Sequence, residues 1–180
     1  MTNSTDNIVK QGSPLESHHF TNAHSIITSS YTHVPDNTVK VISTRFPVPS
    51  RGSSGAAAYD IQANLSHAGW VEVPAGETAV VGTGITLELP SNLMALLLPR
   101  SGLATKHGIT LANAVGLIDP DYRGEIRVAI RNEGKVPFVI RDGDRIAQML
   151  IMGFVSPNFV SVKEVFVTDR GSGGFGSTGV

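Results

Sequence analysis

The chain has 180 residues, a formal net charge of −1, 41% hydrophobic residues and 16% charged residues. This length and composition predict one globular domain with a sizeable core, and the near-zero charge excludes bulk electrostatic attraction to nucleic acid. The absence of cysteine excludes a disulfide framework and thiolate chemistry.

The start of the chain lacks the apolar core of a secretory signal, and no apolar run approaches the ~20 residues that a membrane helix needs. We therefore expect a soluble, cytoplasmic protein that binds neither nucleic acid nor membrane. Residues 1–36 are polar and show no sustained period, so they are predicted to form a flexible N-terminal extension. A β domain is expected over residues 37–169, and a glycine-rich tail over residues 170–180.

Nineteen glycines and ten prolines separate short apolar runs, which predicts an all-β chain rich in turns. The run at 93–98 is apolar on both faces, typical of a strand buried between layers or at a subunit contact. The run at 145–151 has helix-forming residues, but its neighbours favour a strand. One short helical turn is expected through Lys106. The other expected strands are 39–46, 56–63, 71–73, 77–82, 85–89, 108–111, 126–130, 136–140 and 159–167.

The stretch NAVGLIDPDYRGE, residues 113–125, combines an apolar first half with a polar turn. The apolar half is expected to form a narrow hairpin whose backbone groups point inward. Asp119, Pro120 and Asp121 form a strong turn signal, and a second hairpin turn is predicted at residues 142–144. Because Asp119 closes the apolar run, it is a candidate for a carboxylate at the floor of a pocket. The alternative is an ordinary hairpin with a capping carboxylate.

Two further segments carry groups suited to phosphate. Arg100, Ser101 and Gly102 combine a guanidinium, a hydroxyl and an approachable backbone N–H, a sensible clamp for phosphate oxygens. The alternative is a surface turn with an incidental arginine. The tail RGSGGFGSTG, residues 170–179, has the composition of a flexible terminus. Its glycines and hydroxyls can also wrap phosphates, and Phe175 can stack on a base.

Five segments occur in a fixed order: AAAYDIQA at 56–63, PRSGLA at 99–104, NAVGLIDPDYRGE at 113–125, GDRIAQ at 143–148 and RGSGGFGSTG at 170–179. Together they closely resemble the five motifs of the homotrimeric dUTPases, over roughly residues 38–180. The resemblance implies a distorted jelly-roll-like β-barrel that forms a homotrimer, with each active site drawing residues from all three subunits. It also implies Mg²⁺-dependent hydrolysis of dUTP to dUMP and pyrophosphate. This reaction limits uracil incorporation into DNA and supplies dUMP for thymidylate synthesis.

The resemblance assigns roles by position. It implies that Asp119 activates the water that attacks the α-phosphorus and that Tyr122 packs against deoxyribose. No direct metal ligand is implied, and Asp60 would lie in the outer shell of the metal through water. The first motif has Ala58 where the family usually has Gly, which bears on the position of the strand that carries Asp60. The implied uracil-reading residues are Asn113, Gly116, Leu117 and Ile118. The implied phosphate contacts are Arg100, Ser101, Gly102, Gln148, Arg170, Gly176, Ser177 and Thr178, with Phe175 stacked on uracil.

Two other functions remain open from the sequence. A dCTP deaminase shares the fold, although the phosphate-wrapping tail is of the dUTPase type. A regulatory protein that uses the nucleotide-bound state as a signal is also compatible, with the N-terminal extension serving an unknown partner.

Overall fold

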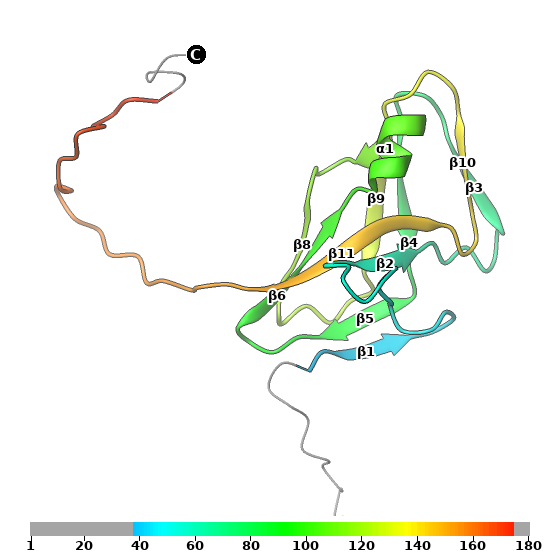
Figure 1. Cartoon of the computed structure of the whole chain (residues 1–180), viewed down its shortest axis with the longest axis horizontal. Helices are drawn as coiled ribbons and strands as arrows, with labels where there is room; N and C mark the ends of the chain where they lie inside the picture. The colour runs from blue at the N-terminus through cyan, green and yellow to red at the C-terminus, as the bar shows by residue number, and fades with distance from the viewer. Residues whose placement is uncertain (1–37, 175–180) are drawn as a thin grey trace, which may run out of the picture. The chain divides into compact units, whose positions relative to one another are not determined.

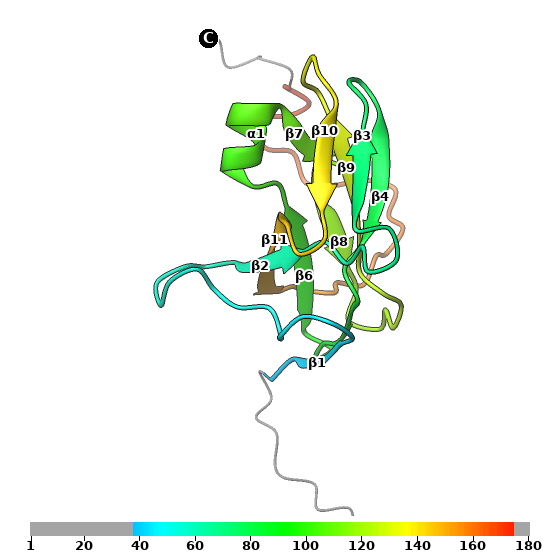
Figure 2. The same cartoon turned by 90° about the vertical axis from the view of Figure 1, so that its right-hand side faces the viewer.

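The computed structural model describes residues 38–174 (Figures 1 and 2). The predicted extension over residues 1–36 lies outside this part of the chain. Within residues 38–174, no helix has both the length and the apolar composition to cross a bilayer. The elements are β1 (Lys40–Ser43), β2 (Tyr59–Gln62), β3 (Trp70–Val73), β4 (Thr78–Gly82), β5 (Ile85–Glu88), β6 (Leu93–Leu98), α1 (Ser101–His107), β7 (Ile109–Leu111), β8 (Gly116–Ile118), β9 (Arg127–Asn132), β10 (Phe138–Arg141) and β11 (Arg145–Gly153).

The described strands form four small antiparallel sheets, ordered β1-β5, β10-β3, β2-β11-β6-β8 and β4-β9-β7. Every sheet contributes buried side chains to one hydrophobic cluster, for example Leu87, Ile140, Leu97 and Ile130. Burying each such side chain stabilises the fold by about 1.5 to 3 kcal/mol. Because four sheets share one interior, the predicted all-β, distorted barrel is confirmed.

Strand β11 shows tertiary pairing overriding local propensity. Its sequence, RIAQMLIMG, contains several good helix formers. It nevertheless pairs with β2 on one side and with β6 on the other. The strand predicted for residues 145–151 is therefore confirmed, because ladder hydrogen bonds on both sides outweigh a weak preference for helix.

Both predicted hairpins are wrong, although both predicted turns exist. At the first turn the Tyr122 N–H donates to the carbonyl of Asp119 at 3.2 Å, but β8 before the turn pairs with β6, whereas β9 after it pairs with β4 and β7. At the second turn Gly143 has φ 82°, but β10 pairs with β3 whereas β11 lies in another sheet. Turn residues fix where the chain reverses, but strand pairing depends on which edge lies nearby in the fold.

The strand predicted over residues 159–167 is also wrong for the single chain. Residues 154–174, coloured orange to red in Figure 1, contain no helix or strand. The side chains of Phe159 and Phe166 are 97% and 100% exposed. The alternating apolar pattern is present, but a strand needs a partner edge, and this segment pairs with none in the described chain.

A buried asparagine closes the loop between β9 and β10. The Asn132 side chain is fully buried, and its Nδ2 donates to the carbonyls of Val73 and Val136, each at 2.9 Å. Its Oδ1 accepts from the N–H of Gly134 at 2.9 Å. Asn132 therefore ties these backbone segments together inside the barrel, and its loss would remove one hydrogen-bond partner from each group.

We predict that Asn132→Ala lowers the free energy of unfolding by about 2 to 4 kcal/mol, because several buried backbone groups lose their partners. Urea unfolding of wild type and variant at the same protein concentration would measure the change. Asn92→Ala, at an exposed position before β6, is the matched control and should stay within about 0.5 kcal/mol of wild type. Equal midpoints for Asn132→Ala and wild type would contradict the prediction.

Candidate active site

The sheet β2-β11-β6-β8 carries many of the predicted site residues. Asp60 on β2 lies opposite Gln148 on β11, and Gln148 in turn lies opposite Leu98 at the end of β6. This register brings Asp60, Gln148 and the segment that follows β6 to the same end of the sheet. Ala58 directly precedes β2, and the strand keeps its pairing with β11 despite the added methyl group.

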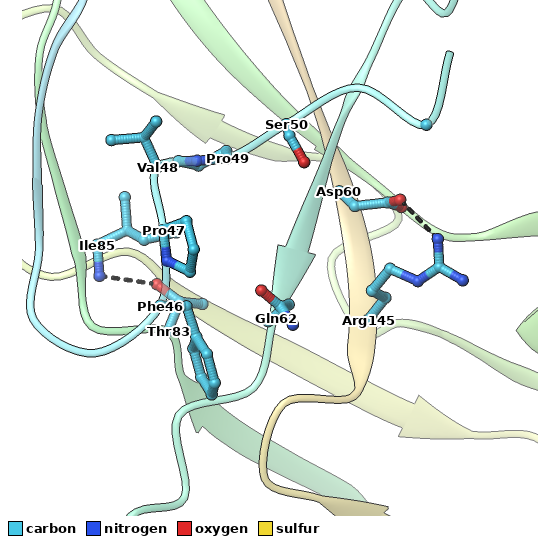
Figure 3. A pocket seen from close by; sticks show the side chains of 11 residues that line it. Phe46, Pro47, Val48, Pro49, Ser50, Asp60, Gln62, Thr83, Ile85 and Arg145 are labelled. Atoms are coloured by element: carbon cyan, nitrogen blue, oxygen red, sulfur yellow. Dashed lines mark hydrogen bonds and ion pairs between the residues drawn. The ribbon is translucent and has the colours of Figure 1, made fainter.

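At this end of the sheet two arginines share one carboxylate. The Arg145 Nη1 lies 3.0 Å from Asp60 Oδ2, and the Arg100 Nε lies 3.4 Å from Asp60 Oδ1. Arg100 also donates from Nη1 to the carbonyl of Arg145 at 2.8 Å. Figure 3 shows Asp60 and Arg145 pointing toward each other at the edge of a cavity of about 230 Å³. Two guanidiniums against one carboxylate leave a positive surplus that can bind an anion.

Arg145 was not predicted as a site residue. It lies in the segment GDRIAQ, and the register between β11 and β2 shifts between Arg145 and Ala147. Such a bulge re-aims the side chains next to it. The sequence shows an arginine three residues before Gln148. Its contact with Asp60 depends on the pairing of β11 with β2, which the sequence does not show.

The backbone at residues 99–102, which follows β6, is held in place and is accessible to a ligand. Gln148 donates from Nε2 to the carbonyl of Pro99 at 2.9 Å, so its side chain fixes the start of this segment. Arg100 is the N-terminal cap residue of α1, with φ −91° and ψ 128°. A Cβ on Gly102 would meet no atom within 4 Å. A ligand can therefore approach the backbone at Ser101 and Gly102 closely.

A second group of predicted residues lies around β8. Asn113, Gly116, Leu117 and Ile118 line a cavity of about 180 Å³, which Arg127 also lines. A Cβ on Gly116 would lie 3.1 Å from the Leu97 Cβ, so glycine permits the close approach of β8 to β6. The prediction that these residues form one small site is consistent with this arrangement, although the site is an arch between two sheets and not a hairpin.

An adjoining cavity of about 180 Å³ is lined by Asp119 and Tyr122, together with Leu117, Ile118, Ile126 and Arg127. Asp119 is exposed in the single chain, so it lies at a rim and not at the buried floor that the sequence suggested. Arg127 lines both cavities, although it was not predicted as a site residue. Alternation along β9 gives the face on which its side chain lies, but not its nearness to Asp119.

The two groups do not meet within one chain. On β6, Ala95 lies opposite Ile118, which directly precedes Asp119, whereas Arg100 lies beyond the other end of the strand. At about 3.3 Å per residue, Asp119 and Arg100 are separated by roughly 15 to 20 Å along the strand direction.

The tail is described only in part. Arg170 donates from Nε to the carbonyl of Gly173 at 3.0 Å. The other predicted tail contacts, Phe175, Gly176, Ser177 and Thr178, lie outside the described residues. Their predicted roles at the base and the phosphates stay predictions.

The family model described as dUTPase matches residues 44–179 of this chain. Similar curated proteins include the deoxyuridine 5'-triphosphate nucleotidohydrolase of Escherichia coli (strain K12 / DH10B). It is 44% identical over 146 residues, which span 78% of this chain and 95% of that protein. The enzyme of the same name from Coxiella burnetii (strain RSA 493 / Nine Mile phase I) is 43% identical over 141 residues, which span 78% of this chain and 91% of that protein.

Solved structures give the same picture. The dUTPase of Staphylococcus bacteriophage 80alpha, solved with dUPNHPP, superposes with a TM-score of 0.72 at 28% identity, covering 80% of this chain and 99% of that one. A mutant dUTPase from phage phi11 of S. aureus, described with a structural Mg(II) ion, superposes with a TM-score of 0.63 at 26% identity. That match covers 71% of this chain and 98% of the other.

Proposed function

The chain belongs to the dUTPase family and is a dUTP diphosphatase, and on this premise we propose how its residues hydrolyse dUTP to dUMP and pyrophosphate. The observation that carries the proposal is the division of the site into a cationic half and a base-sized half. Arg100 and Arg145 share Asp60 at one end of the sheet, whereas Asn113 and Asp119 line small cavities at the other. A nucleoside triphosphate has the same two halves.

Asp119 orients and deprotonates the water that attacks the α-phosphorus. This role is supported by the cavity that Asp119 lines, because that cavity adjoins the one around β8 in which we propose that the base lies. General-base assistance of this kind contributes typically about 10² to 10⁴-fold. The leaving pyrophosphate carries negative charge. Its oxygens accept hydrogen bonds from the Arg100 guanidinium, the Ser101 hydroxyl, the Gly102 backbone N–H and the Gln148 side-chain amide.

The base is read by backbone groups. Gly116, Leu117 and Ile118 offer fixed donors and acceptors along β8, with Asn113 at the turn, and these match the edge of uracil and not that of cytosine. The close approach of β8 to β6 at Gly116 leaves a narrow space, which rejects the 5-methyl group of thymine. Tyr122 packs against deoxyribose and leaves no room for a 2′-hydroxyl.

We propose that a complete site forms between subunits of a homotrimer. The separation between Asp119 and Arg100 along β6 supports this, because one bound nucleotide would need both. An outer apolar face on the same sheet also supports it. Met94, Leu96 and Leu98 are only partly buried, and their neighbours Leu117 and Met152 are 56% and 40% exposed. Symmetric contacts bury such faces.

The segment after β11 supplies the third part of the shared site. Phe159, Phe166 and Val167 are 97%, 100% and 95% exposed in the single chain. Burial of each on another subunit would contribute about 1.5 to 3 kcal/mol. Such docking would carry Arg170 to a neighbour's triphosphate, followed by Phe175 over uracil and by Gly176, Ser177 and Thr178 on the phosphates.

We include Mg²⁺ in the proposal, bound mainly by the triphosphate and water. When bound, it neutralises phosphate charge and orients the α-phosphate. Among residues 38–174 no group of three or more His, Cys, Asp or Glu side chains gathers as a metal cage. Asp60 fits an outer-shell role, because a carboxylate has about four lone-pair sites and two arginines use only part of them.

The curated relatives are named as nucleotidohydrolases, which favours hydrolysis over the deaminase alternative. No observation within residues 38–174 favours the regulatory alternative, whose proposed segment lies outside them. A cytoplasmic location belongs to the same proposal, because a deoxynucleoside triphosphate is an intracellular metabolite.

A substrate panel of dUTP, dTTP, dCTP and UTP with Mg²⁺ tests the whole assignment. We expect pyrophosphate release from dUTP, with kcat/KM lower by about 10²-fold for the other three. Release of ammonia from dCTP would instead mark a deaminase. Comparable turnover of dTTP would contradict the proposed recognition of uracil by the β8 backbone.

Asp119→Asn is predicted to keep dUTP binding but to lower kcat by on the order of 10²-fold or more, because the amide cannot accept a proton from water. Single-turnover kinetics and equilibrium binding of a non-hydrolysable dUTP analogue would separate the two effects. Glu72→Gln, which removes an exposed carboxylate on β3, is the control and should leave kcat unchanged. Wild-type turnover by Asp119→Asn would contradict the proposal that this carboxylate is the general base.

Truncation before Arg170 should leave a folded assembly of unchanged size with little activity, because the barrel is complete at β11 while the tail contacts are lost. Light scattering would report the assembly, and a dUTP assay the activity. Full activity of the truncated chain would disprove the proposed role of the tail.

A further inference from the structure

The ring of Tyr122 occupies space that exists only because residue 124 is glycine. A Cβ on Gly124 would lie 2.6 Å from the Tyr122 Cζ and 3.0 Å from its Cε2, and closer still to the hydroxyl oxygen. Both contacts are at or below the limit that real Cβ atoms tolerate, so any side chain at position 124 must displace the ring. Gly124 does not have a positive φ, so a side chain at position 124 is disfavoured by contact with the Tyr122 ring and not by a left-handed backbone.

A hydrogen bond holds the tip of the same ring. The Tyr122 hydroxyl donates to the carbonyl of Glu125 at 3.0 Å. The Tyr122 N–H donates to the carbonyl of Asp119 at 3.2 Å, which closes the turn between the two residues. Because 45% of Tyr122 is exposed, its position depends on these contacts more than on burial in the core.

Glu125 is in turn fixed to the turn between β4 and β5. Its Oε1 accepts from the N–H groups of Thr83 at 3.0 Å and Gly84 at 2.7 Å. Hydrogen bonds to a charged acceptor are roughly twice as strong as neutral ones. The next residue, Ile126, is fully buried, and its N–H donates to the carbonyl of Ile85 at 2.7 Å. The Glu125 carbonyl, which accepts the hydrogen bond from the Tyr122 hydroxyl, is therefore held in place by contacts on both sides.

From this chain of contacts we propose that Gly124 and Glu125 are positioning residues for Tyr122 and thereby set the preference of the enzyme for deoxyribose over ribose. The inference rests on the proposed role of Tyr122 at the sugar. Tyr122 lines the cavity that also contains Asp119, so a shift of the ring changes the space beside a bound sugar. A ribose differs there by one hydroxyl, and steric exclusion of one hydroxyl is worth up to about 10²-fold.

The test compares kcat/KM for dUTP and UTP in the full-length enzyme with Mg²⁺. Gly124→Ala should lower the dUTP to UTP ratio by about tenfold or more, with a melting temperature near that of wild type because the affected groups are at the surface. Gly55→Ala is the matched control, since a Cβ there meets nothing within 4 Å, and its ratio should equal the wild-type ratio.

Glu125 provides a second route that does not depend on the folding of Gly124→Ala. Glu125→Ala removes the acceptor for Thr83 and Gly84 and should lower the ratio in the same direction. Glu125→Gln keeps an acceptor oxygen and should restore part of the ratio. If these residues had a merely structural role, the variants would be less stable and kcat/KM would fall equally for dUTP and UTP. The dUTP to UTP ratio would then be unchanged.

Tyr122→Ala separates failure of this inference from failure of the proposed function. A lower ratio in Tyr122→Ala with wild-type ratios in Gly124→Ala and Glu125→Ala would overturn the inference and leave the role of Tyr122 intact. Wild-type ratios in all three variants would overturn the inference together with the proposed contact between Tyr122 and the sugar.

Discussion

The pairing of β6 with both β8 and β11 is the constraint on which the rest of the site depends. On one edge, β6 aligns Leu97 with Gly116 and so sets the space beside the base-reading backbone. On the other edge, it aligns Leu98 with Gln148, which holds the segment that begins at Pro99. One strand therefore positions both halves of the proposed site.

The charges around Asp60 serve the same site in a different way. A lone Arg100 side chain at the edge of a sheet would be mobile, whereas the shared carboxylate holds Arg100 and Arg145 in fixed directions. Partial exposure keeps the stabilisation from these ion pairs small. Their value lies in geometry, because donors already aimed at an anion cost little reorganisation when it binds.

The sequence predicted the class of fold, the strand at 93–98 and the strand at 145–151. The first two predictions rest on apolar runs and turn residues, and the third rests on the strands expected on either side of that segment. The two hairpins failed because turn residues such as Pro120 and Gly143 show only where the chain reverses, and not which strands then pair. Arg145 and Arg127 were missed for a related reason, since only strand register places them beside Asp60 and Asp119. The segment containing Phe159 has the alternating apolar pattern of a strand, but it pairs with no strand within residues 38–174.

The separation of the two halves along β6 has a consequence for how the activity is governed. Under the proposed assembly a single chain can fold its barrel and still be inactive, because it does not carry every group that the reaction needs. Total activity then rises more steeply than in proportion to the protein concentration, since active trimers form by mass action.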